Sequence, residues 1–168
     1  LATCHFVEQR RNLVVGGPPG IGKTHLAKAI AHEVCRRQGT VLFRTTSALL
    51  QELLDPVQPQ KSDKLLKRCL KADLLVLDDF AFRKLDSKEA ELLYRLAEER
   101  LSQASTILTS NRPPQDWFAV FPDPVIGNAI LDRLISGAIK IIVTKGRSYR
   151  KEGEKPRSFG LTIQEKDL

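Results

Sequence analysis

The chain has 168 residues, of which 42% are hydrophobic and 28% charged, values ordinary for one globular domain with a buried core. No apolar run approaches the about eighteen residues that a membrane-spanning helix needs, so we expect no membrane segment. The formal net charge of +7 predicts attraction to polyanions such as nucleic acid, although surplus lysines and arginines also serve simply to solvate a surface.

Five short apolar runs predict strands, and helical periodicity fills the intervals between them. Strands that alternate with helices are typical of an α/β fold, here a mainly parallel five-stranded sheet flanked by helices. The expected strands are Leu13–Gly16, Val41–Arg44, Leu74–Asp78, Thr106–Ser110 and Ile139–Thr144. The expected helices run from His25 to Arg37, from an N-cap at Asp86 or Ser87 to Leu101, and from Pro124 to Gly137.

Polar segments that contain proline predict exposed breaks at residues 55–62, 110–116 and 121–124. We expect one folded core over residues 1–150 and a basic, solvent-exposed tail over residues 151–168. The chain begins at Leu1 instead of a methionine, so we expect an upstream domain to be absent from it.

The first predicted strand leads into a phosphate-binding pattern, G-x-x-x-x-G-K-[ST], which the chain matches without a mismatch. Backbone N–H groups of such a loop wrap a triphosphate, and the start of the following helix adds its positive dipole end. Lys23 is expected to reach the β- and γ-phosphates of ATP, and the Thr24 hydroxyl to ligate Mg²⁺. The expected nucleotide-binding residues are Gly17, Pro18, Pro19, Gly20, Ile21, Gly22, Lys23, Thr24 and His25.

The third predicted strand, Leu74–Asp78, ends on two carboxylates. Ligands in open α/β sheets bind at the carboxyl ends of the strands, so we expect Asp78 to hold Mg²⁺ through water, opposite Thr24. Asp79 is expected to point elsewhere, because strand neighbours alternate faces, and to orient and deprotonate the attacking water. Paired aspartates are often only a helix cap or a turn; here the preceding apolar strand and the P-loop favour a catalytic site.

The tip of the fourth strand offers Asn111, whose amide can donate and accept at once and so contact both the γ-phosphate and the attacking water. The spacing fits equally well an Asn111 that only starts the turn of residues 112–114.

Phosphoryl transfer also calls for a charge-stabilising arginine. The sequence offers Arg112, Arg133, Arg147 and Arg150, and an arginine at position 133 would also suit a pair with Asp132 or a glutamate of its own subunit.

The cysteines Cys4, Cys35 and Cys69 are too far apart for a metal-ligand pair, and the odd, scattered number is typical of a reducing cytoplasm. Cys35 and Cys69 fall at apolar positions of helical segments, where we expect both to be packing residues.

Several segments together resemble the IstB-like ATP-binding proteins, which are ATPase helpers of bacterial insertion sequences within the AAA+ group, related to DnaC and DnaA. The segments are GPPGIGKTHLAKAI, LLVLDDF, TILTSNRPPQDW, ILDRLISGAIKIIV and the final SYR, and the resemblance runs from Leu1 to about Arg150. It implies the AAA+ sheet with the P-loop strand central. It also implies that Asn111 senses the γ-phosphate and that Arg133 is an arginine finger acting in trans, which requires a homo-oligomer.

The same resemblance implies a helical element after the second strand, over Ser47–Lys71, that binds duplex DNA and supports assembly. Lys61, Lys64, Lys67 and Arg68 cluster there, although each would equally suit a solvated helix face. Two features depart from the family pattern: Ala81 stands where a glycine often follows the phenylalanine of LLVLDDF, and the tail is too short for a clear helical lid.

The sequence therefore predicts a cytoplasmic ATPase, with ATP and Mg²⁺ as cofactors, that assembles on duplex DNA and assists a transposase. A DnaC-like helicase loader with a replicative helicase as partner uses the same chemistry. A P-loop small-molecule kinase and a non-hydrolysing nucleotide switch are alternatives of another class; the adjacent carboxylates and the short tail favour hydrolysis over a kinase.

Overall fold

Five parallel strands make one sheet in the spatial order β2-β3-β4-β1-β5. The computed structural model describes residues 4–143, so Thr144 and the predicted tail lie outside the described residues. The predicted parallel five-stranded sheet is confirmed, and β1 is an inner strand between β4 and β5, with β4 at the middle of the sheet. The strands are β1 (Leu13–Gly16), β2 (Val41–Thr45), β3 (Leu74–Asp78), β4 (Ser105–Ser110) and β5 (Ile139–Ile142).

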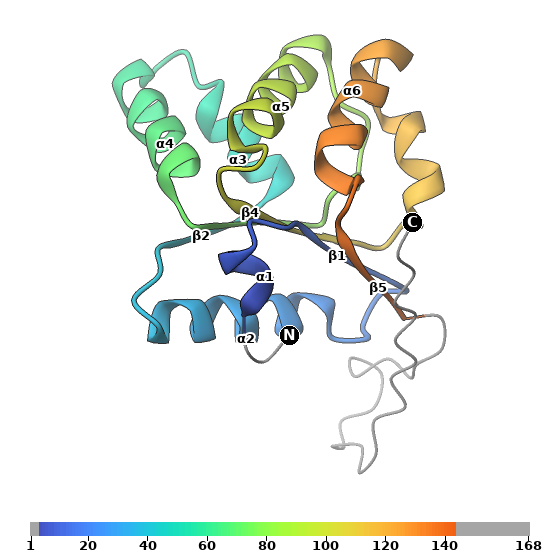
Figure 1. Cartoon of the computed structure of the whole chain (residues 1–168). Helices are drawn as coiled ribbons and strands as arrows, with labels where there is room; N and C mark the ends of the chain where they lie inside the picture. Colours follow the sequence, from blue (N-terminus) through green and yellow to red (C-terminus); the bar gives the residue numbers. More distant parts are fainter. Residues whose placement is uncertain (1–3, 144–168) are drawn as a thin grey trace.

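Helices cover both faces of the sheet (Figure 1). Two helices, α1 (His5–Glu8) and α2 (Lys23–Arg36), lie on one face. The other face carries α3 (Thr46–Leu53), α4 (Pro59–Lys71), α5 (Ser87–Arg100), the 3-10 helix η1 (Pro114–Val120) and α6 (Pro124–Ile135). Within residues 4–143, none of these helices has the length and apolar character needed to cross a bilayer.

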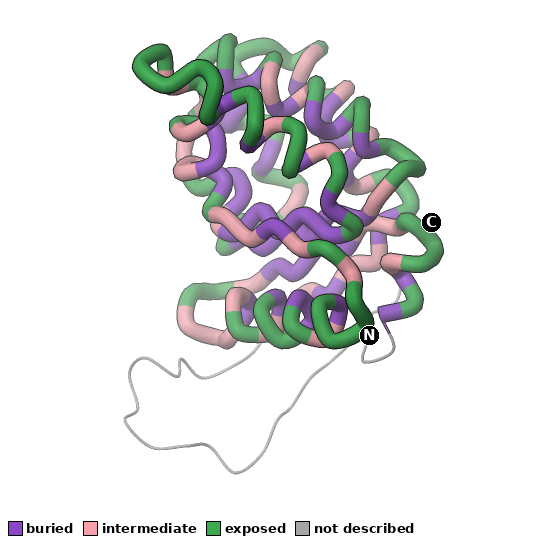
Figure 2. Tube along the Cα trace, turned by 90° about the vertical axis from the view of Figure 1, so that its left-hand side faces the viewer, coloured by how far each residue is buried: buried purple, intermediate pink, exposed green. Residues whose placement is uncertain are grey.

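Side chains of the inner strands alternate between two cores, one on each face of the sheet. In β1, Val14 joins the core under α3–α6, whereas Leu13 and Val15 join the core under α1 and α2. Every residue of β1 and β3 is buried, as expected for parallel strands covered on both faces. Figure 2 shows the buried residues concentrated where helices meet the sheet. In open α/β sheets ligands bind beyond the carboxyl ends of the strands.

The connections differ from the predicted breaks at two places. The loop over residues 55–62 is shorter, because α4 begins at Pro59, whose fixed φ suits the first turn of a helix. Buried Ser62 then donates to the carbonyl oxygen of Glu52 at 2.8 Å. The break over residues 110–116 likewise ends at Pro114, where η1 begins.

Two local predictions on the helices have opposite outcomes. Asp86 is the N-cap of α5, with a complete capping box to Glu89, as the sequence allowed. Cys69 is buried in α4 as expected, but Cys35 is exposed on α2. The prediction that Cys35 packs in the core is wrong, because the neighbouring Val34 takes the buried position of that turn.

Candidate nucleotide-binding site

The P-loop connects β1 to α2 at the carboxyl edge of the sheet, where the parallel strands end. Its glycines adopt backbone positions that residues with a side chain avoid. Gly20 and Gly22 have φ values of 83° and 91°, in the left-handed region that favours glycine. A Cβ on Gly17 would lie 2.6 Å from the carbonyl oxygen of Val143, so the loop also passes too close to β5 for a side chain. The sequence therefore folds here into a loop whose backbone is free to face a ligand.

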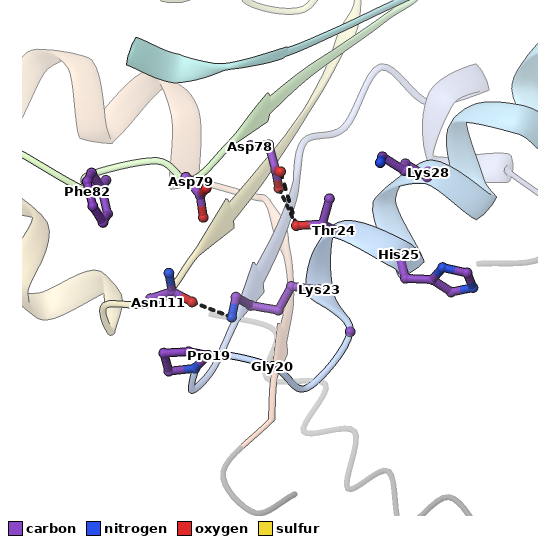
Figure 3. Close-up of a pocket in the computed structure, with 11 residues that line it drawn as sticks. Pro19, Gly20, Lys23, Thr24, His25, Lys28, Asp78, Asp79, Phe82 and Asn111 are labelled. Atoms are coloured by element: carbon purple, nitrogen blue, oxygen red, sulfur yellow. Dashed lines mark hydrogen bonds between the residues drawn. The ribbon is translucent and has the colours of Figure 1, made fainter. Parts of the chain in front are cut away.

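A hollow of about 530 Å³ opens at this edge, between the P-loop and the ends of β3 and β4 (Figure 3). Its walls combine residues that lie far apart in the sequence. Gly17, Pro18 and Ile21 belong to the same loop but are not among the residues that line the hollow. The Pro18 carbonyl oxygen accepts a hydrogen bond from the Lys23 ammonium. The lining residues are Pro19, Gly20, Gly22, Lys23, Thr24, His25, Lys28, Asp78, Asp79, Phe82 and Asn111.

Lys23 joins the P-loop to the tip of β4. Its Nζ donates to Oδ1 of Asn111 at 2.6 Å and to the carbonyl oxygen of Pro18 at 2.8 Å, and its side chain is largely buried. Asn111 thus faces the P-loop lysine across the hollow instead of serving only as the start of a turn. A phosphate oxygen bound in the hollow would replace the Asn111 amide oxygen and the Pro18 carbonyl oxygen as acceptors of the Lys23 ammonium.

The Thr24 hydroxyl lies 3.0 Å from both carboxylate oxygens of Asp78, which is itself buried (Figure 3). A hydroxyl and a carboxylate are oxygen donors of the kind that Mg²⁺ prefers, so these two residues fit the predicted ion. Among residues 4–143 there is no group of three or more His, Cys, Asp or Glu side chains able to hold a metal. Water and the nucleotide phosphates would have to complete the coordination, as is common for Mg²⁺.

Asp79 turns out of β3 with a φ of 52°, a left-handed conformation uncommon for a non-glycine residue. Both Asp78 and Asp79 line the hollow. The left-handed turn at Asp79, and not the alternation of strand residues between the two faces, therefore sets the direction of the Asp79 carboxylate relative to that of Asp78. Figure 3 shows the Asp79 carboxylate directed into the hollow on the Asn111 side of Asp78, and the His25 ring directed away from the Lys23–Asn111 pair.

Arg133 does not join this hollow. On α6, its guanidinium donates to Glu98 through Nε, to the carbonyl oxygen of Ala129 at 2.9 Å and to the Tyr94 hydroxyl at 3.2 Å. It also lies 4.9 Å from the centre of the Tyr94 ring. The hydrogen bond with Glu98 raises the pKa of Arg133 above its ordinary value.

The predicted DNA-binding cations lie on α4, far along the chain from the P-loop. All four side chains are exposed, and none of these side chains makes a hydrogen bond or ion pair within the described part of the chain. They are Lys61, Lys64, Lys67 and Arg68, and Lys71 extends the same helix with the same properties.

Three residues of the site carried no assignment from the sequence. Lys28 lies one helical turn after Thr24, a spacing that places it on the same face of α2. Phe82 lines the hollow although 66% of it is exposed. Thr109 lies behind the two acids and hydrogen-bonds to both residues, which no local pattern indicates.

Comparison with known proteins agrees with this geometry. Residues 1–156 match the family model described as IstB-like ATP binding protein. The chain belongs to this family. It is 38% identical over 151 residues to an insertion-sequence ATP-binding protein of Mycobacterium tuberculosis, covering 89% of this chain. It is also 38% identical over 162 residues to the IS21 ATP-binding protein of Pseudomonas aeruginosa, covering 96%. The chain spans 60% of the length of each of these relatives.

Solved structures confirm the AAA+ P-loop fold. The DnaI structure has a TM-score of 0.73 at 25% identity, covering 84% of this chain and 80% of DnaI. The DnaC helicase loader has a TM-score of 0.70 at 25% identity, covering 84% of this chain and 86% of DnaC. The resemblance noted in the sequence is therefore confirmed for the family and for the fold.

Proposed function

We propose that this ATP-binding protein is a magnesium-dependent ATPase that assembles on duplex DNA and assists a transposase in the bacterial cytoplasm. The observation that carries the proposal is the convergence of Lys23, Thr24, Asp78, Asp79 and Asn111 on one hollow. The transposition role is supported by relatives named as insertion-sequence ATP-binding proteins.

The five converging residues have separate tasks in the proposed reaction. The P-loop amides and Lys23 bind the phosphates, and Asn111 holds the attacking water in line with the γ-phosphate. Asp79 accepts the proton of that water as it attacks phosphorus and the bond to the leaving ADP oxygen breaks. Bound magnesium would supply positive charge to the phosphate oxygens, held by Thr24 and, through water, by Asp78.

The arginine of the reaction is proposed to be Arg133 of a neighbouring subunit. Arg133 pairs with Glu98 of its own subunit, as the sequence also allowed. Because it does not line the hollow of its own subunit, its contact with a bound nucleotide would have to be made in trans. This role requires a homo-oligomer. Arg133→Ala should lower turnover without abolishing ATP binding, and mixing it with Lys23→Ala subunits should restore part of the activity. A mixture with no recovery would contradict action in trans.

DNA binding is proposed for the cations of α4. Because Lys61, Lys64, Lys67 and Arg68 have no acidic partner in the described part of the chain, they are available to phosphate groups. Such contacts do not depend on the DNA sequence, and they weaken as salt is added.

The likeness to the DnaC helicase loader favours a second candidate function, the loading of a replicative helicase. Stimulation of turnover by purified transposase or by purified helicase separates the two roles.

The deciding experiment measures phosphate release against duplex DNA concentration at two salt concentrations, with Lys23→Ala as control. We expect turnover that needs Mg²⁺, rises with DNA and loses its DNA response at high salt. Failure to bind ATP with Mg²⁺ would reject the proposal. A requirement for a nucleoside or sugar acceptor would identify a small-molecule kinase, and binding without phosphate release would identify a nucleotide switch.

A further inference from the structure

We propose that Thr109 is a positioning residue for both acids of the site, an inference that rests on the proposed ATPase function. Thr109 is the residue before the last of β4, and its side chain is fully buried. Its hydroxyl donates to Oδ1 of Asp78 and accepts from the backbone N–H of Asp79 at 3.1 Å. One hydroxyl has one hydrogen and two lone pairs, so a single oxygen atom fixes a carboxylate and the next backbone turn together.

The turn at Asp79 needs such support. A left-handed conformation is unfavourable for a non-glycine residue, and it persists only where the surrounding structure holds it. Hydroxyl groups hold the residues on either side: Thr46 donates to the carbonyl oxygen of Asp78 at 3.1 Å, and Ser110 donates to that of Phe80 at 2.7 Å. Thr109 bonds to Asp79 itself, because its hydroxyl accepts from the Asp79 backbone N–H.

Thr109 also selects the orientation of Asp78. Thr24 lies at 3.0 Å from both carboxylate oxygens and does not distinguish them. Thr109 bonds to Oδ1 alone, which leaves Oδ2 the freer oxygen for a water of the magnesium shell. Removal of the hydroxyl should therefore affect the orientation of Asp78 and the position of Asp79, while the P-loop cradle for the phosphates stays intact.

The test compares Thr109→Val, which removes the hydroxyl and keeps the shape, with Thr109→Ser, which keeps the hydroxyl. In the nucleotide-free protein, the Asp79 amide should exchange its hydrogen faster in the valine variant. The gain in affinity for a non-hydrolysable ATP analogue on adding Mg²⁺ should fall, and kcat should drop, each by about 10–100-fold, as for other residues that orient metal ligands. Analogue binding without Mg²⁺ should be unchanged, and Thr109→Ser should stay within about threefold of the original chain on every readout.

Equal Asp79 exchange and equal magnesium response in Thr109→Val would overturn the inference. So would a serine variant as impaired as the valine variant, since the methyl group and not the hydroxyl would then matter. Absence of phosphate release from the unsubstituted protein rejects the ATPase function instead, and the exchange and analogue-binding measurements still test Thr109. If Thr109→Val does not fold, Thr109→Cys, with its weaker donor, takes its place in the same comparison.

Discussion

Cationic side chains lie at both edges of the sheet, but the groups that accept their hydrogen bonds have different structural roles. At the carboxyl edge Lys23 bonds to a side-chain amide and a loop carbonyl, beside the hollow of about 530 Å³. At the amino edge, where the parallel strands begin, a smaller hollow of about 290 Å³ is bordered by arginines that bond to main-chain carbonyls. Arg10 donates to Ser102 at 3.2 Å, and Arg11 donates to Gly137 at 3.1 Å.

Arg100 shows the difference most clearly. It is buried at the amino edge and donates to the carbonyl oxygens of Cys69, Ala72 and Ser105 and to the Thr106 hydroxyl. Burial lowers its pKa to about 10, so it is still charged at neutral pH. Its acceptors are the ends of α4 and the start of β4, and a ligand could not replace them without disrupting these elements. The amino edge therefore stabilises the fold, and the carboxyl edge is open to exchange its contacts for those of a nucleotide.

The largest effect is expected at the carboxyl edge, from Asp79→Asn. The amide cannot take the proton of the attacking water, so phosphate release should fall by on the order of 10²–10⁴. ATP affinity and thermal stability should stay close to those of the original chain, because the P-loop contacts are intact. Asp116→Asn, an exposed change on η1, is the control. An unchanged rate in Asp79→Asn would show that another group accepts the proton.

At the amino edge, Arg100→Met should act on stability and not on ATP binding. It leaves buried carbonyl oxygens without a donor, which should lower the free energy of unfolding by about 3 kcal/mol in urea titrations. Arg95→Met on the same helix removes only an exposed pair with Glu99 and should cost less than about 1 kcal/mol. If the two variants were equally stable, the contrast between the edges would be wrong.

The loop that carries the acids should respond in the opposite direction. Ala81 has a φ of 58°, which explains why a glycine suits this position. Ala81→Gly should relieve the backbone strain of this left-handed conformation and stabilise the protein by up to about 1 kcal/mol. The greater conformational entropy of glycine in the unfolded chain offsets part of this gain. Ala29→Gly, at an exposed position inside α2, should destabilise it by about 1 kcal/mol. Destabilisation by both changes would contradict the assignment of strain to Ala81.

The smallest effect concerns the first turn of α5. The hydrogen bond from Arg83 lowers the pKa of Glu89 below 4.5, so the ionised carboxylate stabilises the folded state. This contribution is complete above the unfolded pKa and is lost as the pH falls through the lowered folded pKa. Glu89→Gln keeps the capping box, so its unfolding midpoint should fall less than that of the original chain on acidification from about pH 5 to 3. Parallel pH profiles would show that the charge pair contributes nothing.

Local sequence patterns were sufficient for much of the fold. Hydrophobic runs located all five strands to within two residues at their ends, and the Asp86 cap and Pro124 marked the starts of α5 and α6. They failed where burial depends on the neighbour in space: Cys35 has an apolar position by periodicity, yet the solvent lies beside it. The prolines near residues 56–59 indicated a loop, but α4 begins at Pro59, because the fixed φ of proline suits the first turn of a helix as well as a loop.

By itself, the sequence determined the P-loop, its lysine and threonine, and an acid pair at the end of a buried strand, because these are short patterns whose chemistry depends on adjacent residues. The tertiary structure decided that Asn111 meets Lys23, that Thr109 holds both acids, that Asp79 leaves the strand in a left-handed turn, and that Arg100 and Arg133 bond within the chain. Periodicity states which side of an element faces the core, but a hydrogen bond between groups 88 positions apart, as for Lys23 and Asn111, depends on the order and register of the strands.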